Sequence, residues 1–524
     1  MSSLRDDPAR PGPRSAGAGS EPSGGYPVPV PPTVYDALAA RASALIGGPA
    51  GRRTAAGVSW WTPVRVVALI ALGMFALGMV QKLPCYDGAW FTGGDAQYTH
   101  LCYSDIPHLY QGRGFAQDLV PYFDPLPADL SGGMGYLEYP VLTGLFMEIA
   151  SWLTPQPGDL VHSEQVYWLV NSGMLLVCTA FLVVCVVRTH GRRPWDGLLL
   201  ALAPAFALTA TINWDLLAVA LTAASMLMWS RSRPLAAGIL LGLATAAKLY
   251  PVLLLGALFI LCLRAGRWRE YGTTLAGALG AWLAVNLPVM YFAWDGWVRF
   301  YAFSRERGVD YGSFWLIISQ NRAGGLDTTV VNTLSALLAV LLGLGVLLLA
   351  LWAPRRPRYA QLAFLLVAVF ILTNKVYSPQ YVLWLIPLAA LARPRWRDFL
   401  LWQACEVVYF AGIWLYLART TGGGDAPGLS EEQYHWVIAV HLLGTLYLCA
   451  VVVRDMLLPE RDPVRAAGDD DPAGGPLDWA SDTVVLGHPR QGRHALPADA
   501  FDGLGAPPAG QPVRWGTERW GTER

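Results

Sequence analysis

The sequence contains little lysine and little charge of either sign. Three of its 524 residues are lysine and 15% are charged, whereas 54% are apolar. The net charge is zero by simple count, which excludes a chain that binds nucleic acid through a basic surface. So apolar a composition favours a polytopic membrane protein over a set of soluble domains.

Several enzyme signatures are also missing. The sequence has no Gly-rich phosphate-binding loop that opens a helix, no dinucleotide-binding fingerprint and no Ser/His/Asp arrangement. The acidic stretch 84–139 lacks an Asp-x-Asp motif, and its His100 and His108, which flank Asp105, stand eight residues apart. We therefore expect no metal ion and no cofactor. Residues 1–60 hold no apolar run of the secretory kind, so we expect no cleaved signal peptide.

Twelve apolar runs are long enough, or nearly so, to cross a bilayer as helices. Several are shorter than the roughly 20 residues of a straight span. Clusters of arginine fall in every second connection, and all of them lie inside if both tails are cytoplasmic, as the positive-inside rule requires. We predict an all-α fold with about twelve transmembrane helices. The runs cover about 64–83, 164–188, 196–212, 214–230, 234–248, 250–264, 271–293, 329–353, 359–374, 377–393, 398–418 and 433–456.

Two tails flank this membrane domain, which we place at 61–457. Residues 1–60 and 458–524 have the composition of disordered segments and are predicted to be cytoplasmic tails. The first tail also contains a predicted short amphipathic helix around 34–45. The second ends on a repeated Trp-Gly-Thr-Glu-Arg, to which we assign no role.

The apolar segment 139–153 decides the topology. A crossing there would move Arg188–Arg193 to the outer face, against the charge rule. Its Gly144, Glu148 and Ser151 form a polar stripe at helical spacing, so we predict a helix lying on the outer membrane surface. A re-entrant hairpin is the alternative.

The first outer loop, 84–139, holds seven acidic residues against a single arginine, and with the interfacial helix it forms the segment 84–153. Loops of this length are usually functional or disordered, and the many tyrosines here favour an ordered structure. Cys85 and Cys102 are the only cysteines outside apolar runs. A disulfide between them would close the loop and stabilise the fold by about 3 kcal/mol, but the sequence leaves the pairing open.

The three lysines, Lys82, Lys248 and Lys375, each end an apolar run on the predicted outer side. A cation at the centre of a membrane helix costs about 2.5–3.5 kcal/mol. An anionic partner would offset that cost, and a lipid-linked phosphate is a candidate. The alternative is that the lysines reach the headgroup region. Lys248 precedes Tyr250-Pro251, where proline breaks the helix and frees backbone groups, and Lys375 follows Asn374 before a similar break.

Four stretches carry a family resemblance. In this order they resemble the GT-C superfamily of integral membrane glycosyltransferases and, more narrowly, the actinobacterial family 87 enzymes related to polyprenyl-phosphomannose-dependent α-mannosyltransferases. The resemblance covers about residues 64–456 and neither tail. The stretches are Tyr103-Ser-Asp-Ile-Pro-His-Leu-Tyr110, Glu138-Tyr-Pro-Val141, Leu241-Gly-Leu-Ala-Thr-Ala-Ala-Lys-Leu-Tyr-Pro251 and Tyr377-Ser-Pro-Gln-Tyr-Val-Leu-Trp384.

The resemblance implies transfer of a sugar, mannose by analogy, from a polyprenyl-phosphate donor to a glycolipid or cell-envelope glycan at the extracytoplasmic face of the cell membrane. Asp105 matches the family's Asp-before-Tyr position and is the first choice for the general base that deprotonates the acceptor hydroxyl. Asp95 and Glu138 come next. The alternative is a structural Asp105 that caps a helix or pairs with a cation.

Cations would hold the leaving phosphate of such a donor. Lys248 and Lys375 are the candidates, with Tyr250 and Asn374 beside them. Asp215 stands in a tight outer turn, where it would bind a hydroxyl, pair with a lysine or serve only as a turn residue.

The outer loop 294–327 adds further candidates for substrate contact. Its aromatic residues form either an interfacial belt or a groove for sugar rings and isoprenoid, and its arginines, which include Arg305 and Arg307, would pair with an anionic lipid acceptor. The substrate-binding residues predicted from this loop and from the Tyr377 stretch are Trp297, Arg299, Tyr377 and Gln380.

Two other functions fit the same features. A transporter or flippase for a lipid-linked sugar would also have twelve spans, broken helices and intramembrane cations. The sequence shows no obvious internal repeat, however, and its charges cluster on the predicted outer side. The third possibility is a scaffold whose tails recruit partners.

Overall fold

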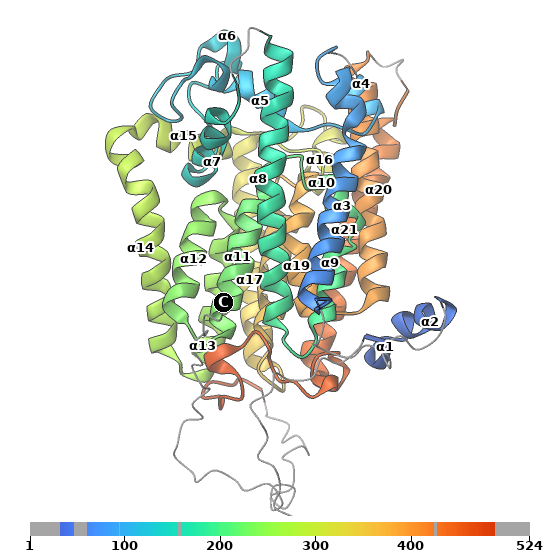
Figure 1. The fold of residues 1–524 in the computed structure, drawn as a ribbon. Helices are drawn as coiled ribbons and strands as arrows, with labels where there is room; N and C mark the ends of the chain where they lie inside the picture. Colours follow the sequence, from blue (N-terminus) through green and yellow to red (C-terminus); the bar gives the residue numbers. More distant parts are fainter. Residues whose placement is uncertain (1–31, 47–59, 94, 156–158, 424–426, 488–524) are drawn as a thin grey trace, which may run out of the picture.

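The computed structural model describes residues 32–46, 60–93, 95–155, 159–423 and 427–487, and its regular structure over these ranges is helical throughout. The long helices lie side by side and form one elongated bundle, and the short helices between residues 85 and 152 gather at one end (Figure 1). The predicted all-α class is confirmed.

Each of the twelve predicted apolar runs is helical. The run at 196–212 is broken in two, because Pro204 lacks the backbone N–H that would continue the helix and instead starts a new one. The chain passes along the bundle as α3 (Pro63–Gln81), α8 (Leu160–Thr189), α9 (Gly197–Ala201) with α10 (Pro204–Thr209), α11 (Asp215–Ser230), α12 (Pro234–Ala247), η5 (Tyr250–Val252) with α13 (Leu253–Ala265), α14 (Trp268–Phe292), α17 (Thr328–Trp352), α18 (Tyr359–Thr373), η6 (Pro379–Tyr381) with α19 (Val382–Ala392), α20 (Trp396–Thr421) and α21 (Glu431–Leu457).

Six of these helices are long and apolar enough to cross a membrane by themselves: α3, α8, α14, α17, α20 and α21. The other passes are shorter than a straight span needs. The protein is a polytopic membrane protein, and the count of twelve crossings stays a prediction.

The arginine clusters gather at one end of the bundle, which we call the arginine-rich end. It contains the connections that follow α8, α11, α13, α17 and α19. Two of these connections touch directly, since the Arg231 side chain donates to the carbonyl of Arg188 at 3.3 Å. The opposite end, which we call the loop end, contains η2 (Cys85–Ala89), α4 (Ala96–Thr99), α5 (Asp105–Gly112), η3 (Phe115–Gln117), α6 (Ala128–Ser131), α7 (Val141–Trp152), α15 (Trp294–Glu306) and α16 (Phe314–Gln320).

The described residues 458–487, which follow α21, are folded onto the bundle, which differs from the disorder predicted for this part of 458–524. Asp462 pairs with Arg358, and both side chains are fully buried. Asp482 pairs with Arg264 and Arg356, at 2.8 and 2.7 Å. The acidic residues fold this segment onto the bundle because they neutralise arginines that would otherwise be buried unpaired. The repeated pentapeptide lies outside the described residues.

The predicted N-terminal helix is also present, as α1 (Pro32–Tyr35) and α2 (Ala37–Ile46). The Tyr35 hydroxyl donates to Asp196 at 2.8 Å, and its ring lies 3.8 Å from the guanidinium of Arg193. This contact fixes α1 at the arginine-rich end. The rest of the predicted tail, at 1–31 and 47–59, lies outside the described residues.

Helix α7 occupies the predicted interfacial segment, but its polar stripe faces protein. Gly144 packs against the Tyr122 ring, so closely that a Cβ there would come within 2.1 Å of the hydroxyl oxygen. The Ser151 hydroxyl donates to the Phe115 carbonyl at 3.3 Å. The surface of α7 is instead apolar at Leu145, which is 46% exposed. The ordered first loop therefore supplies the partners of Gly144 and Ser151, whereas Glu148 accepts from the Trp152 indole on α7 itself at 2.7 Å.

The buried pair at the arginine-rich end gives a stability prediction. Asp462→Asn leaves Arg358 buried beside a neutral partner, which should destabilise the fold by about 3–5 kcal/mol. Asp469→Asn is the matched control, since its partner Arg192 is 44% exposed, and it should cost less than about 1 kcal/mol. Thermal unfolding in detergent measures both, and equal melting temperatures for the two variants would contradict the buried pairing.

Candidate active site

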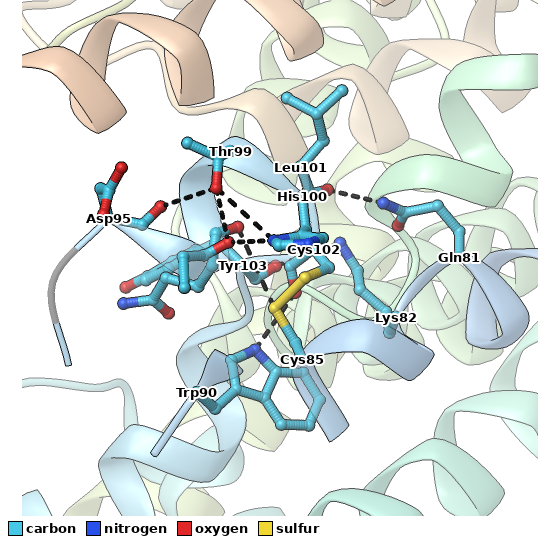
Figure 2. Close-up of a disulfide and its surroundings, with 12 residues drawn as sticks. Gln81, Lys82, Cys85, Trp90, Asp95, Thr99, His100, Leu101, Cys102 and Tyr103 are labelled. Carbon is cyan, nitrogen blue, oxygen red and sulfur yellow. Dashed lines mark hydrogen bonds between the residues drawn. A yellow bond between two sulfur atoms is a disulfide. The ribbon is translucent and has the colours of Figure 1, made fainter. Parts of the chain in front are cut away.

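A disulfide closes the start of the first loop. Cys85, in η2, is bonded to Cys102, so the pairing that the sequence left open is present. Figure 2 shows the bond beside the end of α3, with the Trp90 indole donating to the Cys102 carbonyl at 3.1 Å. These contacts hold residues 85–102 as one compact unit.

Two side chains at the end of α3 secure the residues that follow. Gln81 donates to the Leu101 carbonyl at 2.7 Å, and the Lys82 ammonium donates to the Tyr103 carbonyl at 3.1 Å (Figure 2). The first of the three lysines is fully buried and is therefore used to hold the chain just ahead of Asp105.

Asp105 is the first residue of α5, and both of its carboxylate oxygens are oriented. Ser104 caps the helix, and the backbone N–H of Asp105 donates to the Ile212 carbonyl at 2.8 Å. Oδ1 accepts from the Tyr103 hydroxyl at 2.7 Å, and Oδ2 accepts from the Asn213 amide at 2.8 Å. Burial and the neighbouring Asp105 charge raise the pKa of Tyr103 well above its ordinary value, so the phenol remains a donor. Because both donors are neutral, the carboxylate is aimed without being neutralised.

Asn213 joins this carboxylate to Tyr139. Its amide also donates to the Tyr139 hydroxyl at 2.8 Å, and its Oδ1 accepts from the Trp214 backbone at 2.6 Å. The ammonium of Lys248 lies 5.6 Å from the centre of the Tyr139 ring, within range of a cation–π contact. Asp105 and Lys248, which are distant in sequence, therefore lie on two sides of one tyrosine.

Lys248, at the end of α12, is paired with Asp215 at the start of α11. Their charged atoms are 3.4 Å apart, and Asp215 is fully buried. The other oxygen of Asp215 accepts from the Trp384 indole at 2.7 Å. Tyr250 stacks on the same indole with ring centres 4.3 Å apart. The predicted residues Asp215, Lys248 and Tyr250 thus form one cluster next to Asp105.

The two other candidate bases differ from Asp105. Glu138 accepts two bonds from the Arg113 guanidinium, each at 2.6 Å, so it is neutralised. Asp95 stands before α4, where its backbone carbonyl accepts from the Thr99 hydroxyl at 3.3 Å. Of the three predicted carboxylates, Asp105 has the geometry that best suits a base.

Several other predicted contacts have different partners. Arg299 pairs with Glu306 on its own helix at 3.0 Å. Tyr377 is buried in the bundle, where its hydroxyl lies 3.4 Å from Glu406, and Gln380 is buried nearby in η6. Asn374 follows α18 as its capping residue. The hydrogen bonds and ion pairs of these side chains do not include Asp105 or Lys248.

A groove opens on the other face of Tyr139, between α7, α12, α14 and α15. Trp297 stands in it, and its indole donates to Asn286 at 3.0 Å. Aromatic and apolar side chains supply most of the lining, which suits an isoprenoid chain or the face of a sugar. The lining residues are Tyr139, Pro140, Val141, Thr245, Ala246, Leu249, Trp282, Asn286, Trp297, Phe300 and Tyr301.

Residues 136–373 match the sequence model of glycosyltransferase family 87. Over these residues, which are less than half of the chain, it is similar to the glycosyltransferases of family 87. No match is found among curated proteins. The matched residues include Tyr139, Asn213, Asp215, Lys248 and the groove, whereas Asp105 precedes the match and Lys375 follows it.

Sequence reasoning missed the residues that connect the site. Asn213 lies in the turn from which the sequence analysis named only Asp215, and only the fold shows that its amide donates to both Asp105 and Tyr139. Trp384 was seen in a motif without a role, and its bond to Asp215 again depends on the packing of two distant helices. Among the described residues, no group of three or more His, Cys, Asp or Glu side chains is placed to hold a metal ion.

The disulfide gives a stability prediction. Replacing Cys85 and Cys102 together by Ser should lower stability by about 3 kcal/mol, the loop-closure value for the separation of 17 residues. Cys178→Ala, at a free cysteine in α8, is the control and should shift the melting temperature much less. Alkylation without reductant, followed by mass spectrometry, checks the bond. Full labelling of Cys85 and Cys102 in the folded protein would contradict it.

Proposed function

We propose that this chain transfers a sugar, mannose in the first instance, from a polyprenyl-phosphate donor to a glycolipid or cell-envelope glycan. The observation that carries the proposal is the Asp105 carboxylate, which Tyr103 and Asn213 aim without neutralising it, beside the aromatic groove that Tyr139 borders. A general base and an adjoining aromatic surface are the two elements that such a transfer needs.

The reaction would proceed in one displacement. Asp105 takes the proton of the acceptor hydroxyl, whose oxygen then bonds to C1 of the donor sugar. The bond between C1 and the phosphate oxygen breaks, and polyprenyl phosphate leaves with the electron pair. Direct attack inverts the configuration at C1. Tyr103 and Asn213 orient the carboxylate toward the acceptor.

The groove supports a lipid-linked donor. Trp297 and Tyr301 supply aromatic surface on one side, and Tyr139 links this surface to the Asp105 site. Lys248, next to the Tyr139 ring, places a positive charge where the apolar lining meets the polar site. A soluble nucleotide-sugar has no apolar chain that would contact the apolar part of the groove.

The charge distribution supports an extracytoplasmic site. The arginine-rich end satisfies the positive-inside rule if it faces the cytoplasm, and the loop end with Asp105 then faces outward. Polyprenyl-phosphate sugars are donors suited to that side, since no nucleotide pool is required there.

Replacement of the base is the decisive test of the function. In membranes that contain the chain, Asp105→Asn should reduce transfer from labelled polyprenyl-phosphomannose by about 10²–10⁴-fold, because the amide cannot take the proton. Asp129→Asn, an exposed position in the same loop, is the matched control and should retain activity. Full activity of Asp105→Asn would move the base to Asp95 or Glu138. No transfer by the native chain would sink the donor assignment.

The groove gives a separate kinetic prediction. Trp297→Ala should raise the KM for the donor about tenfold, the factor that corresponds to loss of an aromatic contact of about 1.4 kcal/mol. Trp294→Ala is the control, since Trp294 is 54% exposed and stacks on Trp297 from outside the groove. Equal KM values for the two variants would show that the groove does not hold substrate.

A further inference from the structure

The Lys375 ammonium, which the sequence analysis predicted to bind a phosphate, instead bonds to backbone carbonyls. It donates to those of Arg305, at 3.2 Å, and Arg307. The Lys375 carbonyl accepts from the Asp310 backbone at 2.8 Å. The lysine is 5% exposed and therefore holds the chain between residues 305 and 310 from behind.

The same short segment has a second anchor in Asp310. This side chain is 8% exposed and accepts from the Ser378 hydroxyl at 2.9 Å and from the Tyr311 backbone at 2.8 Å. Gly312 follows in close contact with the Tyr377 carbonyl, where a Cβ would come within 2.0 Å of the oxygen. The segment is thus held against the connection between α18 and η6, which restricts where Arg307 can point.

Arg307 is the cation that this scaffold presents. Its guanidinium pairs with Asp310 at 3.0 Å, and its side chain is 39% exposed. By comparison, the side chain of Lys248 is 15% exposed and that of Arg113 is 12% exposed. Arg307 therefore has donors left for a ligand, whereas the other two cations are more fully enclosed.

Packing brings the Arg307 segment next to the cluster around Asp215, because Asp310 accepts from Ser378 in the connection before η6, and Tyr381 of η6 stacks on the Trp384 indole that donates to Asp215. Burial alone lowers the pKa of Arg307, but the charge of Asp310 and then the neighbouring Tyr381, Tyr139 and Asp105 raise it on balance. Tyr139 and Asp105 are the two residues that Asn213 joins. Conversely, burial and the proximity of Arg307 lower the pKa of Lys375, as expected for a cation behind another cation.

We propose that Arg307 binds the phosphate of the polyprenyl-phosphate donor and that Lys375 is the positioning residue that holds Arg307 in place. This inference rests on the proposed function. It assigns the phosphate to Arg307, whereas the sequence analysis predicted that Lys248 and Lys375 bind it. A guanidinium can offer two parallel N–H donors to a phosphate, in a geometry that an ammonium cannot match.

The chemistry gives Arg307 a role in rate as well as in binding. When the bond between C1 and the phosphate oxygen breaks, the phosphate gains negative charge. A cation beside it therefore binds the transition state more tightly than the ground state. Its removal should lower kcat in addition to raising the KM of the donor.

Binding of polyprenyl phosphate, the leaving group itself, tests the proposal without regard to the sugar. In nanodiscs, Arg307→Gln should bind it at least about tenfold more weakly than the native chain, and Arg307→Lys should recover part of the loss. Arg322→Gln, which removes an exposed positive charge after α16, is the matched control and should bind normally. A melting temperature for each variant separates weaker binding from misfolding.

The outcomes distinguish this inference from the function on which it rests. If the native chain and Arg307→Gln bind polyprenyl phosphate equally well, the assignment of Arg307 is overturned and the proposed function is not. Native chain that binds no polyprenyl phosphate would overturn both. Loss of binding in Arg307→Gln with an unchanged melting temperature is the expected result.

The role of Lys375 has its own test. If it acts through Arg307, the double variant Arg307→Gln/Lys375→Met should bind no more weakly than Arg307→Gln alone, since the object that Lys375 positions is already gone. If Lys375 touches the phosphate directly, the two losses should multiply. Multiplying losses would contradict the positioning role.

Discussion

The side-chain amide of Asn213 is the contact on which the proposed active site depends. Its donors bind Asp105 and Tyr139, which are 108 and 74 residues away in sequence. One small amide thus aligns the first loop, the turn between α10 and α11, and the entrance to α7. Since the same tyrosine borders the aromatic groove, this amide also sets the position of the proposed base relative to the proposed lipid surface. An aspartate at position 213 would repel the Asp105 carboxylate, so this contact requires a neutral side chain at that position.

The short helices explain how polar groups can gather in a largely apolar bundle. Helices α11 and α19 begin, and α12 and α18 end, near the loop end, and η5 and η6 interrupt the chain beside them. A helix end leaves backbone groups without partners inside the helix, and proline at Pro251 and Pro379 enforces the break. Side chains such as Lys248 then project from the ends rather than into lipid. The site occupies the level at which these helices stop, and long helices such as α17 border the bundle without such breaks.

Periodicity and charge were enough to predict the fold, whereas the contacts of the site were not. Apolar runs gave the helices because each pass must satisfy its own backbone, and arginine spacing gave their alternation. Asp105, Lys248 and Asp215 were visible as unusual charges, and the structure clusters them. The partner of each charge was not visible, since it depends on which helices pack together. Lys375 illustrates this limit: the sequence shows a cation at a helix end, but its carbonyl partners belong to a segment about 70 residues earlier. The acidic segment after α21 was taken as disordered for the same reason, because its arginine partners lie in distant connections.

The two ends of the bundle differ in how completely their charges are paired. At the arginine-rich end, Arg358 and Asp462 enclose each other, and such a pair serves structure alone. At the loop end, Asp105 has neutral donors, and within the described part of the chain it forms no ion pair, while the Arg307 side chain pairs with a single carboxylate and is 39% exposed. A folded chain gains nothing from keeping a base and a cation apart in this way. An acceptor hydroxyl beside Asp105 and a phosphate beside Arg307 would complete both groups, as the proposed transfer requires.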